Sequence, residues 1–212
     1  DELCFLDITA SLEKREILFD IINKTAKNCF MPLTVGGGVS SVEDVRKLLL
    51  AGADKVSINS SAIKNPSLIA DASENFGKQC IVIAIDAKKT NNKNIKSGYE
   101  VFSHGGTRET NLDVLDWAKK CVILGAGEIL LTSMDNDGTK KGFNINLTKK
   151  ITNEISTPVI ASGGVGELEH FTKGAKEANA SGLLAASVFH YGKFTIQQVK
   201  KALLQEGVPV RV

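Results

Sequence analysis

The sequence contains none of the patterns that mark a metal site, a disulfide scaffold or a membrane protein. Its four cysteines, Cys4, Cys29, Cys80 and Cys121, include no C-x-x-C pair and have no neighbouring histidine, so they do not suggest a zinc site. No apolar stretch approaches the length of a membrane span, and the first residues show no basic region followed by an apolar one. We therefore expect a cytoplasmic protein with buried free thiols and with neither a metal nor another cofactor.

The chain is also poor in net charge. Its 26 basic and 24 acidic residues leave a formal net charge of +2, and no block of Lys and Arg stands out. This balance argues against a surface built for nucleic acid or another polyphosphate. With 42% apolar residues in 212, the chain is long enough for one sizeable core, so we expect a single domain over residues 1–212.

What the chain does contain is a regular alternation of strands and helices. In its central stretch, VIAIDAK at 82–88, an apolar run ends at Asp86, as in a strand buried on both faces. Similar runs and helical periodicity predict seven strands, each followed by a helix. The predicted strands are 3–8, 32–35, 55–58, 80–86, 128–132, 158–161 and 182–185, and the predicted helices lie near 12–26, 42–51, 65–76, 112–124, 146–155, 167–178 and 196–205.

One connection does not fit this regular pattern. The polar stretch 87–111 is too long for a routine loop, so we expect it to fold over a site, with a small hairpin around 99–102. The three histidines, His104, His170 and His190, show no mutual spacing that would build a site. We interpret them as structural or surface residues.

The sequence repeats itself at a fixed spacing. PLTVGGGV begins at 32 and PVIASGGV at 158, while VSINSSAI at 56 aligns with GLLAASVF at 182, so the members of each pair lie 126 residues apart. A duplicated set of βα units predicts an α/β fold, an eight-stranded (βα)8 TIM barrel of two half-barrels. The counterpart of Asp86 would fall before residue 1. We therefore expect the first strand and helix, about 45 residues, to be missing from this chain; a natural seven-unit variant is the alternative.

The ends of the predicted strands carry the residues that suggest chemistry. Asp86 is either a functional carboxyl or merely the cap of the next segment. Glycines let the backbone approach an anion, and short helices that begin nearby offer free N–H groups. These features occur twice, at Gly37–Gly38 with Asn59–Ser60 and at Gly163–Gly164 with Ala186–Ser187. The duplication predicts two phosphate sites and a ligand with a phosphate at each end.

The loop DNDGT, which contains Asp135 and Asp137, invites comparison with a calcium site. It lacks the further carboxylates and the terminal Glu that a calcium-binding loop has. We therefore expect Asp137 and Gly138 to lie near the ligand at the end of their strand.

Several stretches together resemble a known family. They are FLDITAS at 5–11, TVGGGV at 34–39, GADKVSIN at 52–59, AIDAK at 84–88, GAGEILLTSMDNDGTKKG at 125–142, IASGG at 160–164 and LAASVFH at 184–190. The chain resembles, over nearly its whole length, the cyclase subunit of imidazole glycerol phosphate synthase, an enzyme of histidine biosynthesis. The resemblance implies a heterodimer in which a glutaminase partner supplies ammonia. The substrate would be the phosphoribulosyl formimino carboxamide nucleotide, and the products imidazole glycerol phosphate and aminoimidazole carboxamide ribotide.

The resemblance also implies roles for individual residues. Asp86 matches one of two catalytic aspartates, and the other belongs to the strand that the repeat places before residue 1. The substrate and phosphate contacts implied are Asp7, Gly38, Asn59, Ser60, Thr132, Asp137, Gly138, Gly163, Gly164, Ala186 and Ser187. At the opposite face, Glu2, Lys55 and Glu128 match a charged ring at the ammonia entrance, whose fourth, basic member would lie in the missing segment. Asp54 matches a residue that meets the glutaminase.

Two other functions stay open. The related isomerase one step earlier in the pathway has a similar barrel with two phosphate sites, although AIDAK, SVFH and the three charged residues favour the cyclase. A chain without its first strand could also serve as a non-catalytic module that docks to a glutaminase.

Overall fold

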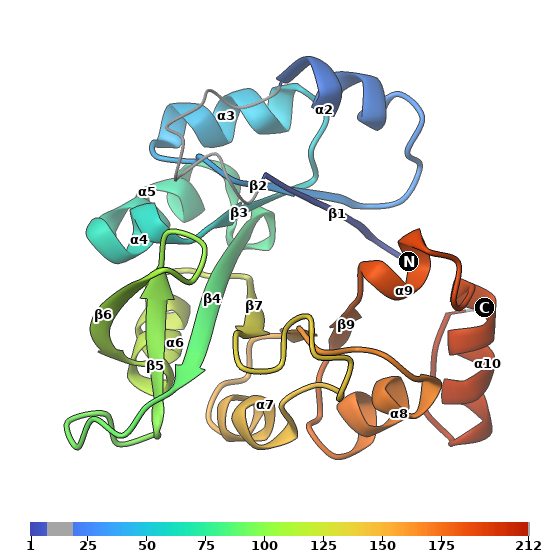
Figure 1. Cartoon of the computed structure of the whole chain (residues 1–212). Coiled ribbons are helices and arrows are strands. Elements are labelled where there is room, and N and C mark those ends of the chain that lie inside the picture. Colours follow the sequence, from blue (N-terminus) through green and yellow to red (C-terminus); the bar gives the residue numbers. More distant parts are fainter. Residues whose placement is uncertain (8–18, 212) are drawn as a thin grey trace.

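A computed structural model describes residues 1–7 and 19–211. Seven parallel strands form one sheet, and they neighbour each other in chain order (Figure 1). The strands are β1 (Leu3–Leu6), β2 (Leu33–Gly36), β3 (Lys55–Ile58), β4 (Ile81–Lys89), β7 (Glu128–Ser133), β8 (Val159–Ser162) and β9 (Gly182–Leu184). All seven predicted strands are therefore confirmed. The sheet curls into an open, half-barrel-like surface, which is consistent with part of a TIM barrel.

Helices follow the strands and cover the outer side of the sheet. They are α2 (Phe19–Ala26), α3 (Val42–Leu50), α4 (Ser60–Lys64), α5 (Ser67–Phe76), α6 (Val114–Ile123), α7 (Ile145–Thr152), α8 (Leu168–Lys176), α9 (Ser187–His190) and α10 (Ile196–Gln205). A single 3₁₀ turn, Lys78–Cys80, leads into β4. In Figure 1, α3 and α5 lie beside the first strands, and α7 and α8 lie along the last ones. The part of the predicted 12–26 helix before residue 19 lies outside the described residues.

The connection between β4 and α6 forms an antiparallel hairpin, β5 (Tyr99–Ser103) and β6 (Arg108–Asp113). β5 pairs with the far half of β4, with Asp86 opposite Phe102 and Lys89 opposite Tyr99. The predicted hairpin is confirmed, and it is larger than expected. Its second strand, β6, includes Leu112 and Asp113. The helix predicted from residue 112, α6, therefore begins at Val114, with Asp113 as its N-cap.

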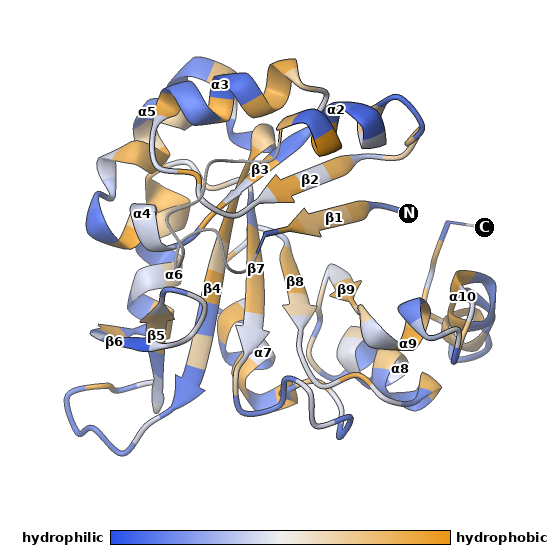
Figure 2. Cartoon of the chain, turned by 45° about the horizontal axis from the view of Figure 1, so that its top comes forward, coloured by the Kyte–Doolittle hydropathy of each residue, from blue (hydrophilic) through white to orange (hydrophobic). Residues whose placement is uncertain are grey.

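The core lies between the sheet and its helices. Alternate residues of β4, namely Ile81, Ile83, Ile85 and Ala87, are fully buried and belong to the larger of two apolar clusters. Figure 2 shows the apolar colouring concentrated on the strands and on the inward faces of the helices. Because successive strand residues point to opposite faces, Asp86 lies on the other, concave face of the sheet.

Local signals set several element ends. At the start of α3, the Ser41 hydroxyl accepts a hydrogen bond from the backbone N–H of Asp44, and the Asp44 carboxylate accepts one from the Ser41 N–H. The two residues are three positions apart, which is the spacing of a capping box. The bounds of α3 and α8, 42–50 and 168–176, are also 126 residues apart, as the sequence repeat requires.

The two ends of the sheet differ from its middle. In the described part of the chain, β1 pairs with β2 alone and β9 with β8 alone. Leu3 and Leu6 are each 39% exposed, whereas Leu33 on the neighbouring strand is 1% exposed. The parallel sheet therefore has open edges at β1 and β9 in the described residues. Next to β1, Asp1 contacts the C-terminal helix, where Lys200 Nζ lies 2.7 Å from Asp1 Oδ1.

The cysteine prediction is partly wrong. All four cysteines are free thiols, but only Cys121 is buried, and Cys4, Cys29 and Cys80 are partly exposed. Burial raises the pKa of the Cys121 thiol to about 12. Separately, none of the helices within the described ranges has both the length and the apolarity to cross a membrane.

Candidate active site

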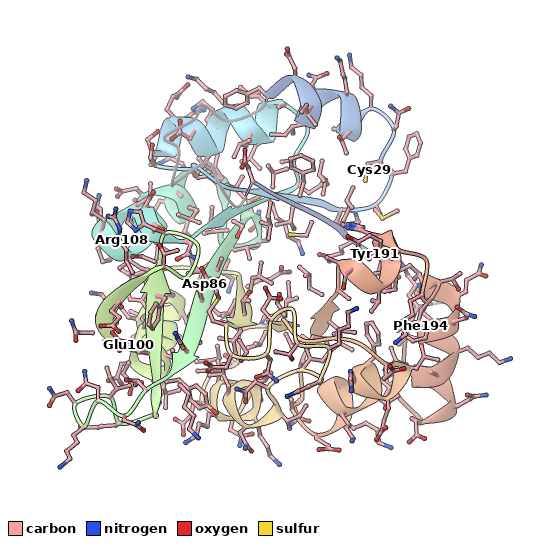
Figure 3. All side chains as sticks on the ribbon, viewed as in Figure 1. Cys29, Asp86, Glu100, Arg108, Tyr191 and Phe194 are labelled. Atoms are coloured by element: carbon pink, nitrogen blue, oxygen red, sulfur yellow. The ribbon has the colours of Figure 1, made fainter. Side chains whose placement is uncertain are left out.

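Asp86 lies near the C-terminal end of β4, next to the corresponding ends of its neighbours. In the sheet register it stands beside Thr132 of β7 and opposite Phe102 of β5. The amide nitrogen Nδ2 of Asn59, which follows β3, donates a hydrogen bond of 2.9 Å to Asp86 Oδ2. Figure 3 places Asp86 inside the curve of the sheet. The structure thus brings together three predicted site residues from three neighbouring strands.

The surroundings of Asp86 change its acidity. Burial raises the pKa of the Asp86 carboxyl above its ordinary value, and the negative charge of Asp137 raises it further. The hydrogen bond from Asn59 opposes this rise because it favours the charged form. A carboxyl whose pKa is raised by burial next to a second carboxyl is suited to general acid and base chemistry.

The first glycine-rich loop follows β2. Gly37 and Gly38 both have positive φ, 107° and 73°. A Cβ at Gly37 would collide with the carbonyl oxygen of Asp7, so this close approach of two strand ends requires glycine. Asp7 is itself fixed to this end of the sheet, because its backbone N–H donates to Gly36 O over 2.9 Å.

The loops after β2 and β3 are joined to each other. Ser61 donates its hydroxyl to the carbonyl oxygen of Val39 over 2.6 Å. α4 begins at Ser60, as predicted, with Asn59 as its N-cap residue. The Asn59 side chain makes no capping hydrogen bond to the helix, and its amide nitrogen donates to Asp86 instead. Its oxygen Oδ1 is buried and has no hydrogen-bond partner within the described ranges.

The second glycine-rich loop follows β8 and supports the loop after β7. Gly163 and Gly164 have φ of 94° and 95°. A Cβ on Gly163 would lie 2.9 Å from Ser133 O and 3.4 Å from the Cβ of Asp137. The N–H of Gly142 donates to Gly164 O over 2.7 Å, which closes the loop. Gly138 has open space where its Cβ would be, so this part of the loop leaves room at the site.

The remaining predicted phosphate residues lie farther along the sheet. Ala186 precedes α9, which begins at Ser187, as predicted for a short helix after the strand. They follow β9, which is separated from β4 by β7 and β8. The structure thus places them at the same end of the sheet as Asp86, but three strands away.

The N-terminal ends of the strands carry a separate charged cluster. Lys55 Nζ lies 3.0 Å from Glu2 Oε2 and 2.5 Å from Glu128 Oε1. Burial alone would lower the pKa of the Lys55 ammonium, but hydrogen bonds and charge from Glu128 and Glu2 outweigh it, so the pKa is raised. Three of the four predicted gate residues thus meet at the end of the sheet opposite Asp86.

The residue predicted to meet the glutaminase at this face, Asp54, has a different local role. Asp54 Oδ2 accepts a hydrogen bond of 2.8 Å from the backbone N–H of Leu33. It therefore helps to hold β3 against the beginning of β2, and it is not part of the Lys55 cluster.

Sequence reasoning predicted that the hairpin folds over a site, but it identified none of the contacts that the hairpin makes there. The backbone N–H of His104, in the turn between β5 and β6, donates to the hydroxyl of Ser60 over 2.8 Å. The His104 ring stands 3.0 Å from Ser103 Oγ and 3.4 Å from the guanidinium of Arg108. The signal was the length and polarity of 87–111, but the partner, 44 residues away, left no local trace.

Within residues 1–7 and 19–211, no group of His, Cys, Asp and Glu side chains is arranged to hold a metal ion. The fold and the site together define a class: an α/β protein with a partly buried carboxyl near the C-terminal ends of its parallel strands, between two glycine-rich loops. That is the end at which parallel sheets of this kind bind their ligands. A family model described as histidine biosynthesis protein matches residues 1–195. The chain therefore belongs to the histidine biosynthesis protein family.

Proposed function

We propose that this protein is the cyclase subunit of imidazole glycerol phosphate synthase. In this function it takes ammonia from a glutaminase and converts the phosphoribulosyl formimino carboxamide nucleotide to imidazole glycerol phosphate and aminoimidazole carboxamide ribotide. The observation that carries the proposal is Asp86, a partly buried carboxyl near the C-terminal end of a central strand. It is held by Asn59 and is close enough to Asp137 for the charge of Asp137 to raise its pKa. No cofactor is needed for this assignment.

Asp86 is proposed as one of two catalytic aspartates. Its raised pKa makes the carboxylate a stronger base than that of an exposed aspartate, which suits it to exchange a proton with the substrate. Asn59 fixes the carboxyl through Oδ2, which leaves Oδ1 as the atom that faces the substrate. A positioned proton transfer of this kind contributes about 10²- to 10⁴-fold in rate.

The second aspartate is proposed to lie on a strand that pairs with β1 and β9 in a longer natural chain. The open edges of these two strands and the 39% exposure of Leu3 and Leu6 support this placement. The natural protein would then have an intact mass about 5 kDa above that of these 212 residues, from the additional 45 or so. An equal mass would contradict the placement and favour a module that docks to a glutaminase without catalysis.

The two phosphates are assigned to the two glycine-rich loops. Gly38, Asn59 and Ser60 hold one of them, with Asp7 at the same mouth. Gly138, Gly163, Gly164, Ala186 and Ser187 hold the other, beside Thr132 and Asp137. Positive φ at the glycines and the helix starts at Ser60 and Ser187 support this assignment, because both expose backbone N–H groups.

The Lys55 cluster is proposed as the ammonia entrance. It lies at the end of the strands opposite Asp86, so ammonia entering there would reach the substrate through the interior of the barrel. Glu128 Oε2 is buried and has no hydrogen-bond partner in the described part of the chain. That vacancy suits a further basic residue, which is the fourth gate member expected from the family. Asp54 is proposed to contact the glutaminase beside this entrance.

The isomerase one step earlier is the second candidate. The Asp86 carboxyl and the two glycine-rich loops also suit its bisphosphate substrate, so these features do not separate the two reactions. The experiment that does is turnover of the ring-opened nucleotide by the protein as its source cell makes it, with and without ammonium. Ammonium-dependent formation of imidazole glycerol phosphate is expected. Conversion of the ring-closed precursor without a nitrogen donor would identify the isomerase instead.

A further inference from the structure

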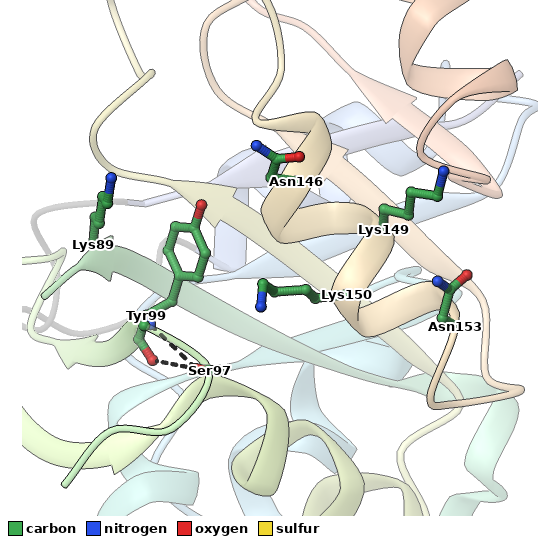
Figure 4. A pocket seen from close by; sticks show the side chains of 8 residues that line it. Lys89, Ser97, Tyr99, Asn146, Lys149, Lys150 and Asn153 are labelled. Carbon is green, nitrogen blue, oxygen red and sulfur yellow. Dashed lines mark hydrogen bonds between the residues drawn. The ribbon is translucent and has the colours of Figure 1, made fainter. Parts of the chain in front are cut away.

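A groove on the outer side of the sheet is independent of the site around Asp86. It has a volume of about 440 Å³ and lies between β4, β5 and α7 (Figure 4). Its walls are formed by Lys89, Ser97, Gly98, Tyr99, Asn146, Lys149, Lys150 and Asn153. The volume falls in the range of about 300 to 1,000 Å³ that is usual for small-molecule sites.

The groove opens on the face of β4 opposite the proposed catalytic site. Asp86 and Lys89 are three residues apart on one strand, so their side chains point to opposite faces of the sheet. Ala87, which shares the face of Lys89, is fully buried among the helices. A molecule bound beside Lys89 would therefore not touch Asp86.

The charge of the groove is positive and unbalanced. Three of its lining residues are lysines, and none is acidic. In Figure 4, Lys150 points toward Tyr99 and Ser97 from α7, while Lys89 stands on the other side of the Tyr99 ring. Within residues 1–7 and 19–211, no carboxylate lies within 4.0 Å of the ammonium group of Lys89 or of Lys150. The nearby Asp135 carboxylate accepts a hydrogen bond of 2.7 Å from the backbone N–H of Lys89.

The wall of the groove is held in place by the protein itself. Asp113 Oδ2 accepts a hydrogen bond of 2.7 Å from the Ser97 N–H. Gly98 accepts one of 3.0 Å from the Thr90 N–H, which closes the loop between β4 and β5. The Tyr99 hydroxyl is 3.5 Å from Asn144 Oδ1, at the start of α7. A ligand would therefore meet a formed surface and would not have to order the loop first.

The positive region has a defined limit. An adjoining hollow of about 360 Å³ shares Ser97, Lys150 and Asn153 but is also lined by Asp113, Asp116 and Glu154. These carboxylates would repel an anion there, which restricts it to the part of the groove between Lys89 and Lys150.

We propose that this lysine groove binds a small molecule that carries a phosphate group with two or more negative charges. Lysine ammonium groups recognise phosphate as point charges, and the Asn146 and Asn153 amides can add hydrogen bonds to the rest of the molecule. The site does not depend on the proposed cyclase reaction, since none of its residues belongs to that assignment.

The test is a titration with inorganic pyrophosphate at constant ionic strength, followed by NMR of the backbone amides. Saturable shifts are expected at Ser97, Gly98 and Tyr99. The variant Lys89→Gln/Lys150→Gln should weaken binding at least tenfold, while Asp86→Asn should leave these shifts unchanged. Exposed lysine substitutions of this kind usually alter stability by under about 0.5 kcal/mol, so the variant is expected to fold.

The matched control is Lys47→Gln/Lys64→Gln, which removes two exposed lysines in the last turns of α3 and α4. It changes the net charge by the same amount and should leave binding within twofold of the unmodified protein. Equal weakening in both variants would show a general charge effect and overturn the proposal. Shifts confined to the loops around Asp86 would overturn it as well.

Discussion

Asn59 donates its side-chain amide to Oδ2 of Asp86 over 2.9 Å, and this bond joins the ends of two neighbouring strands. It opposes the effects of burial and of Asp137, both of which raise the pKa of Asp86. Besides burial, two neighbours of opposite effect thus act on the pKa of the carboxyl. Two substitutions that are expected to shift this pKa in opposite directions therefore test the arrangement.

Replacing Asn59 by Ala removes the hydrogen bond that favours the charged carboxylate. The pKa of Asp86 is therefore expected to rise further above its ordinary range. Asp137→Asn removes the neighbouring negative charge, so the pKa of Asp86 is expected to fall. Titration of the Asp86 carboxyl by carbon NMR measures both effects without requiring catalysis. Shifts of the same sign in the two variants would contradict the assignment of causes.

The raised pKa also predicts how stability depends on pH. The folded protein holds the Asp86 proton more tightly than the unfolded chain does. The resulting contribution to stability is present below the unfolded pKa of about 3.9 and is lost as the pH rises through the folded pKa. Asp86→Asn removes this loss. The free energy of unfolding of the variant, relative to the unmodified protein, should therefore be greater at pH 7 than at pH 3. Urea unfolding at the two pH values measures it, and an equal difference at both would refute it.

Lys55→Met leaves Glu128 partly buried without its cation. The side chains of Lys55 and Glu128 are only 14% and 18% exposed, so water can replace the lost partner only in part. A loss of about 1–3 kcal/mol in the free energy of unfolding is expected, as for a hydrogen bond to a charged group. Urea denaturation at pH 7 measures this loss.

The matched control for this variant is Lys119→Met, which breaks the pair between Lys119 and Glu154. Both of these side chains are more than 40% exposed. Its expected cost is smaller than that of Lys55→Met, because solvent screens exposed pairs. Equal losses in the two variants would mean that the burial of the Lys55 cluster has no energetic consequence.

The sequence predicted well what depends on local residues. The helix predicted over 42–51 is α3, 42–50, and α10 has the predicted bounds, 196–205. The apolar run before Asp86 predicted a buried strand at this place, and β4 has it, although β4 continues three residues past Asp86 to Lys89. These features arise from neighbouring residues, so a single sequence is sufficient to predict them.

Features that depend on distant partners were predicted incompletely. β6 has the sequence RETNLD, which lacks the apolar alternation of a strand, and it forms because β5 offers a pairing edge. β4 continues to Lys89 because its last residues pair with β5, whereas its pairing with β7 stops at Ala87. The hydrogen bond from Asn59 to Asp86 joins residues 27 apart, and the fold alone brings them together.

The most direct test of the central claim uses Asp86→Asn in the protein at its natural length, assayed with ammonium and the ring-opened nucleotide. Asp71→Asn, an exposed change on α5, is the control. Asp86→Asn is expected to lower turnover by about 10²- to 10⁴-fold, whereas the control is expected to retain full turnover. Both variants should stay folded. Unchanged turnover in Asp86→Asn would contradict the catalytic role of Asp86 and, with it, the proposed function of this site.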